Sequence, residues 1–153
     1  MERWTQTHID VAGIVMGRRD QFVRYEGCLL VAMTNIIRQV HEENIRVSDI
    51  DNILDFNSGY TQEGYIRWNV LEDCFNFKHV KHNKDKFGRI EFSSDSNKFW
   101  VVQTEYGTSG HFSEVIDHVG DTVFFFDSYN GEKNHVQKKN CISIREITFE
   151  VKK

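Results

Sequence analysis

The first half of the chain carries apolar residues at helical spacing. From Leu29 onward they recur every three or four positions, which predicts a helix of about 15 residues. Residues 48–59 predict a second, shorter helix, with Ser48 as its N-cap, aspartates in its first turn and Gly59 as its stop. A third helix is expected within residues 65–77, where apolar side chains again share one face. The N-terminal half is therefore expected to be helical.

After residue 77 the pattern changes to β-rich runs separated by Gly, Asn and Asp. These runs lie at 77–82, 98–106, 110–119, 122–129 and 141–151. Helices followed by strands predict an α+β fold, with the N-terminal helices packed on one side of a C-terminal antiparallel β-sheet. The length of 153 residues, without an internal repeat or linker, indicates a single domain over residues 1–153.

Composition and charge narrow the function classes. The net charge of −4 arises from 19 basic and 23 acidic residues without long blocks of one sign, so we expect no nucleic-acid partner and no membrane partner. Apolar runs are shorter than a membrane span, and we expect no signal peptide. The 3 widely spaced cysteines fit neither a disulfide framework nor a Cys-x-x-Cys metal site, which indicates a reducing, cytoplasmic location. The oligomeric state is left open.

One cysteine has a position that suits a reactive thiol. The stretch YEGCLLVAMTNIIRQV, residues 25–40, places Cys28 after a glycine and at the start of the first predicted helix. A lone cysteine beside a helix is most often a buried packing residue. Free N–H groups and the helix dipole at a helix start favour a thiolate, whereas the neighbouring Glu26 disfavours it. Position alone leaves both interpretations open.

A thiolate nucleophile needs a base and a third group that orients the base. His111 opens one predicted strand and Asp127 closes the next, although each residue alone is more often a local hydrogen-bonding group. The two are 16 positions apart. A strict two-residue turn would point them to opposite faces of the sheet, whereas a loop with an odd number of residues or a bulge would put them on one face.

Several short motifs together point to a known family. They are Gln21 and EGC before an apolar helix, GYTQEGYIRWNVL in the middle of the chain, and GHF followed by FDSYNG. Over residues 20–132 the chain resembles the bacteriocin-processing, double-glycine-leader peptidases and their wider papain-like relatives. It departs from that family at Ser128, where proline is usual. Lacking an ATP-binding or membrane segment, it resembles the free-standing bacterial or phage-encoded versions.

The resemblance implies a papain-like fold and a cysteine peptidase or amidohydrolase that acts on a peptide or protein substrate without a metal or other cofactor. It implies that Cys28 is the nucleophile, His111 the general base and Asp127 the residue that orients the histidine. Gln21 would contribute to the oxyanion hole together with the Cys28 backbone N–H. Two alternatives stay open: an acyltransferase or transglutaminase-like enzyme with the same triad, and a catalytically inactive binding or structural protein.

Aromatic and histidine residues add two predictions. Trp68 is expected to line a substrate cleft beside the helices and the sheet, although aromatic residues at such positions are more often buried. His79 and His82 are three positions apart in a charged, strand-like stretch, so their side chains would point to opposite faces. A solvated segment is therefore favoured over a metal site there.

Overall fold

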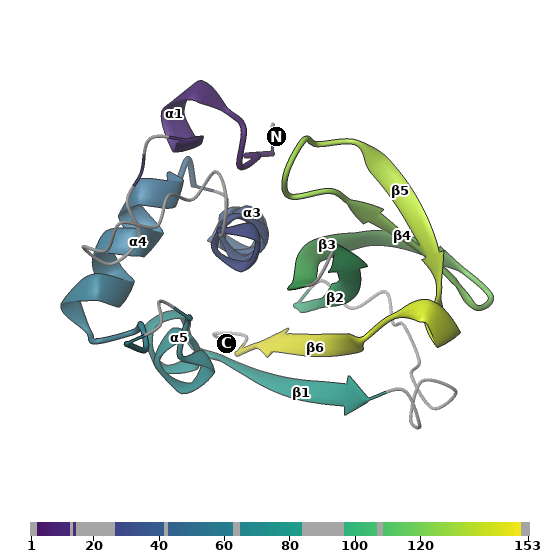
Figure 1. Cartoon of the computed structure of the whole chain (residues 1–153). Coiled ribbons are helices and arrows are strands. Elements are labelled where there is room, and N and C mark those ends of the chain that lie inside the picture. The colour runs from purple at the N-terminus through teal and green to yellow at the C-terminus, as the bar shows by residue number, and fades with distance from the viewer. Residues whose placement is uncertain are drawn as a thin grey trace.

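The structure is a computed structural model of the 153-residue chain, and it describes residues 3–12, 14, 27–41, 43–62, 65–83, 97–106 and 109–150. Its helices are α1 (Ile9–Ala12), α3 (Cys28–His41), α4 (Val47–Phe56) and α5 (Trp68–Phe75). Its strands are β1 (Phe77–Asn83), β2 (Lys98–Tyr106), β3 (Ser109–Val119), β4 (Thr122–Phe126), β5 (Lys133–Gln137) and β6 (Ser143–Phe149), with a short 3-10 turn at Lys138–Asn140. The predicted α+β class is confirmed (Figure 1).

The strands form one antiparallel sheet in the order β1-β6-β2-β3-β4-β5. The last strand of the chain, β6, is inserted between β1 and β2, while β3 and β4 form a hairpin. The sequence did not predict β5, because its side chains are mostly exposed and carry no apolar alternation. The turn between β4 and β5 lies beside the N-terminal end of the chain (Figure 1).

Helix α3 is the central element of the core. Its residues from Leu29 to Arg38 are all buried. It lies between α4 on one side and the sheet, where it packs against β3, on the other (Figure 1). It starts at Cys28, at the predicted position, and its first intrahelical bond runs from the Val31 N–H to the Gly27 carbonyl at 2.9 Å. The first helical turn is therefore placed rigidly against the sheet.

The second predicted helix exists, but its expected N-cap is wrong. Helix α4 begins at Val47 and its N-cap is Arg46, not Ser48. The reason is that the Asp49 carboxylate accepts the Arg46 N–H at 2.9 Å, so the capping side chain comes from inside the helix. The helix ends before Gly59, as predicted, and an added Cβ at Gly59 would lie 2.8 Å from the side chain of Leu54.

The N-terminal segment, residues 3–7, is tied to both α3 and the sheet. The Trp4 N–H donates to Oδ1 of Asn35 at 2.7 Å, and the Asn35 side-chain amide donates to the Trp4 carbonyl at 3.0 Å. One residue earlier, Arg3 forms an ion pair at 3.0 Å with Glu114 of β3, which is fully buried. These contacts fix the segment across the end of the helix layer.

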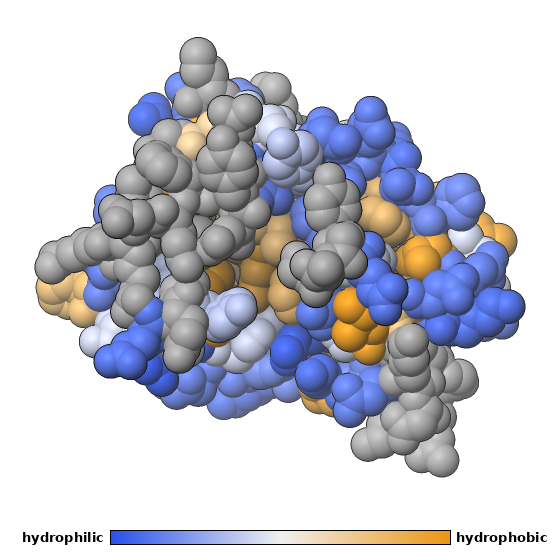
Figure 2. Space-filling view, in the orientation of Figure 1, coloured by the Kyte–Doolittle hydropathy of each residue, from blue (hydrophilic) through white to orange (hydrophobic). Residues whose placement is uncertain are grey.

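The surface shows separate apolar patches. Hydrophilic side chains cover much of the described part of the face in Figure 2, and the apolar patches between them are not continuous. No helix in the described ranges is both long and apolar enough to cross a membrane. Among the described residues, the exposed large apolar side chains are two from α4 and one each from the loop before α5, from β1 and from β3: Ile53, Phe56, Tyr65, Val80 and Val119.

Replacing Asn35 tests how strongly the N-terminal segment is held. We expect Asn35→Ala to lower the free energy of unfolding by about 2 kcal/mol, because two backbone groups of Trp4 lose their partner. Chemical denaturation measures this change. The matched control is Asn52→Ala, at an exposed position of α4. If both substitutions lowered the free energy of unfolding equally, the conclusion that Asn35 holds the Trp4 backbone would be wrong.

Candidate functional site

The β3–β4 hairpin contains a β-bulge. Near the turn, Asp117 pairs with Phe124, whereas further along Val115 pairs with Phe125. Ile116 is thus an extra residue in β3 without a partner in β4. Because side chains alternate along a strand, one inserted residue reverses which residues of β4 share a face with a given residue of β3.

The bulge places His111 and Asp127 on the same face of the hairpin. Nε2 of His111 lies 3.0 Å from Oδ1 of Asp127, and the carboxylate accepts this hydrogen bond. The turn at Gly120 is a two-residue turn, since Val119 and Thr122 on either side of it are paired. With that turn and no bulge the two side chains would point apart, so the bulge is the feature that allows the contact.

Cys28 reaches this pair from the start of α3. Its Sγ accepts a hydrogen bond from the Phe112 N–H at 3.4 Å, and its side chain is also hydrogen-bonded to His111. The last residue pair between β3 and β4 is Glu114–Phe126, so the sulfur lies beside β3 where β4 has already ended. The structure brings Cys28, His111 and Asp127 together, while their catalytic roles stay predictions.

His111 is held in its protonated form. The side chain is largely buried, with 9 % exposure, and burial by itself lowers its pKa. The hydrogen bonds and negative charges of Asp127 and Cys28 outweigh burial and raise the pKa of His111 to about 9. Because Nε2 faces Asp127, Nδ1 is the ring nitrogen left to face the sulfur. A protonated imidazole therefore lies beside the Cys28 sulfur.

Asp127 is held ionised by several donors. Burial raises its pKa, but the hydrogen bond from His111 and the backbone N–H groups of Tyr129 and Asn130 outweigh burial and lower it. The Tyr129 N–H lies 2.8 Å from Oδ1 of Asp127. The carboxylate therefore keeps its charge at neutral pH and fixes the orientation of the imidazole.

The turn that carries Asp127 is fixed by the N-terminal segment. The Gln6 N–H donates to the Ser128 carbonyl at 2.7 Å. The backbone N–H and the hydroxyl of Thr7 both donate to the Tyr129 carbonyl, at 3.2 and 3.0 Å. These contacts have no signature in the sequence, because most of the bonds are made by backbone groups.

Two further site residues were predicted, Gln21 and Trp68. Gln21 lies outside the described residues. Trp68 begins α5, where its ring stacks on His79 with centroids 4.5 Å apart, and the Arg145 guanidinium lies 4.3 Å from the centre of its ring. These contacts make Trp68 part of the packing between α5 and the sheet. A contact between Trp68 and a substrate stays a prediction.

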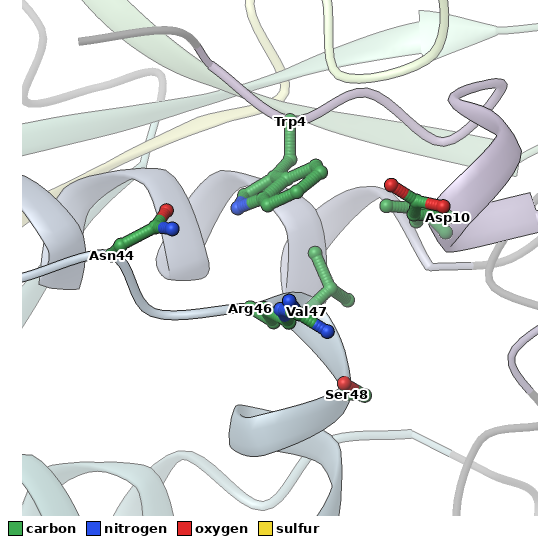
Figure 3. Close-up of a pocket in the computed structure, with 7 residues that line it drawn as sticks. Trp4, Asp10, Asn44, Arg46, Val47 and Ser48 are labelled. Carbon is green, nitrogen blue, oxygen red and sulfur yellow. The ribbon is translucent and has the colours of Figure 1, made fainter.

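Two cavities are separate from the triad. One, of about 380 Å³, lies between the N-terminal segment, α1 and the loop before α4 (Figure 3). The other, of about 390 Å³, lies between α4 and α5. Within the described ranges no group of three or more His, Cys, Asp or Glu side chains could hold a metal ion. The first cavity is lined by Trp4, Asp10, Val11, Asn44, Arg46, Val47 and Ser48.

Comparison of the sequence with known proteins finds no relative. No protein-family model matches the chain, and no curated protein matches it.

The charge on Asp127 should control the titration of His111. We expect the His111 ring to titrate near pH 9 in the intact chain and at clearly lower pH in Asp127→Asn, because burial then opposes protonation with less compensation. Nuclear magnetic resonance of the imidazole ring measures both values. Asp117→Asn, at an exposed position of the same hairpin, is the matched control and should leave the titration unchanged. The same midpoint in all three proteins would contradict the ion pair.

Proposed function

We propose that the chain is a cysteine peptidase or amidohydrolase with a papain-like fold, which cleaves a peptide or a related amide. The observation that carries the proposal is the position of His111, which is hydrogen-bonded to Asp127 at 3.0 Å and also to Cys28. A base between a nucleophile and an orienting carboxylate is the arrangement required for acyl transfer. The resemblance to double-glycine-leader peptidases agrees with it in the order of the three residues.

The geometry supports a two-step reaction. The Cys28 thiolate attacks the carbonyl carbon, and the new oxyanion is met by the Cys28 backbone N–H at the start of α3 and, in this proposal, by the Gln21 amide. His111 then gives its proton to the leaving amine as the C–N bond breaks, which leaves a thioester. A water molecule, activated by the now neutral His111, attacks the thioester and releases the acid and the free thiol. Asp127 stabilises the imidazolium in both steps.

The other two cysteines are poor nucleophiles by comparison. Cys141 is fully buried, with 0 % exposure. Burial raises the pKa of Cys74, and the nearby charge of Asp73 raises it further. Cys28 is partly exposed and has an imidazolium beside it. A reagent that requires a thiolate should therefore select Cys28.

Alkylation and cleavage together test the proposed function. At neutral pH we expect iodoacetamide to label Cys28 at least about tenfold faster than Cys74 or Cys141, as read by mass spectrometry of the digested protein. We expect the chain to cleave members of a diverse peptide library, and Cys28→Ala to abolish the cleavage. Cys74→Ala is the matched control and should retain it. Equal labelling of the three cysteines would overturn the proposal, as would cleavage that survives Cys28→Ala.

The rate of cleavage should fall on the alkaline side as His111 loses its proton. Below about pH 9 the imidazolium carries the proton that the leaving amine needs, and above that pH it does not. We therefore expect kcat/KM to decline as the pH rises through about 9, and the decline to begin at lower pH in Asp127→Asn. Initial rates between neutral pH and about pH 10 measure this limb. An alkaline limb that Asp127→Asn does not move would contradict the role of the carboxylate.

A further inference from the structure

The peptide groups of Phe112 are held at both ends. Its N–H donates to Sγ of Cys28 at 3.4 Å, and its carbonyl accepts a hydrogen bond from the Ser128 hydroxyl at 2.9 Å. Phe112 follows His111 directly in β3, so the same short stretch of backbone carries the imidazole and the N–H that faces the sulfur. The orientation of this stretch therefore affects both groups that contact the thiol.

Ser128 takes the place of a missing strand partner. On one side Phe112 is paired with Gln103 of β2, whereas on the other side the pairing of β3 with β4 ends at Glu114–Phe126 and leaves Phe112 without a strand partner. Backbone groups that point to the side without a strand partner need another hydrogen-bonding group to satisfy and orient them. The Ser128 hydroxyl is that group for the Phe112 carbonyl, and its side chain is buried with 1 % exposure.

Ser128 is itself fixed in position. Its carbonyl accepts the Gln6 N–H at 2.7 Å, and it follows Asp127 in the turn that ends β4. One turn therefore positions the carboxylate that orients His111 and the hydroxyl that holds the Phe112 carbonyl. A hydrogen bond from an N–H to sulfur stabilises the charged thiolate more than the neutral thiol.

We propose that Ser128 is a positioning residue for the nucleophile: its hydroxyl fixes the Phe112 backbone so that the Phe112 N–H donates to the Cys28 thiolate. This inference rests on the proposed function, in which Cys28 is the reactive thiol, and it names a further residue of that site. Ser128 contacts neither the substrate carbonyl nor the sulfur in this scheme, and acts through Phe112.

The test is the pH dependence of Cys28 alkylation in Ser128→Ala. We expect the rate with iodoacetamide at neutral pH to fall by about fivefold, and the midpoint of the pH–rate profile to move to higher pH, because the thiolate loses a well-placed donor. Ser128→Thr keeps the hydroxyl and should restore the profile. Ser113→Ala is the matched control, because Ser113 lies next to Phe112 in β3 and its buried hydroxyl has no hydrogen-bond partner among the described residues. It should leave the profile unchanged.

A second measurement covers the case in which Ser128→Ala does not fold, as judged by circular dichroism. In the intact chain the Phe112 amide resonance should shift with the same pH midpoint as the alkylation rate, and this shift should vanish in Cys28→Ala. A folded Ser128→Ala protein with the pH–rate profile of the intact chain would overturn the inference and leave the proposed function standing. A Phe112 amide resonance that does not shift with the pH midpoint of Cys28 alkylation would have the same meaning. Equal alkylation of Cys28 and Cys74 in the intact chain would instead overturn the proposed function itself.

Discussion

The extra residue at Ile116 decides whether His111 and Asp127 can contact each other. With a two-residue turn at Gly120 and no bulge, His111 and Asp127 would lie on opposite faces of the hairpin. The bulge costs one unpaired residue in the ladder and brings the imidazole and the carboxylate to 3.0 Å. The remaining features of the site depend on this contact, since the carboxylate both orients the ring and keeps it protonated.

The site lies where regular structure stops. Helix α3 begins at Cys28, β4 ends at Phe126, and the Phe112 N–H faces the gap that follows. Helix starts and strand ends leave backbone groups without regular partners. Here the Phe112 N–H donates to the sulfur, and the Tyr129 N–H donates to the Asp127 carboxylate. The ionisation of His111 and Asp127 depends on the same local contacts. Burial opposes the ionised forms of both residues, whereas nearby hydrogen bonds and opposite charges favour them.

The elements with strong periodicity were predictable, whereas the geometry that joins them was not. Helix α3 and strand β2 follow directly from their apolar patterns, and residue types in the order Cys, His and Asp suggested the triad. The bulge at Ile116 has no signature, because neither glycine nor a break in the pattern marks it. The N-terminus of α4 is capped by Asp49 and not by Ser48. Both side chains can cap a helix, so the sequence alone does not distinguish them. The contacts of the N-terminal segment arise largely from backbone groups, which composition does not show.

The N-terminal segment connects the buried core to the side chains of the candidate site. Asn35, in the middle of α3, holds the backbone of Trp4, and two residues later the Gln6 N–H holds the turn that carries Asp127. Cys28 lies at the start of that same helix. Cys28 and the turn that carries Asp127 are thus both attached to α3, so a small displacement of the helix moves them together. The position of the Asp127 carboxylate relative to the sulfur is therefore better protected than it would be if that turn were a free loop, and the carboxylate in turn orients the imidazole.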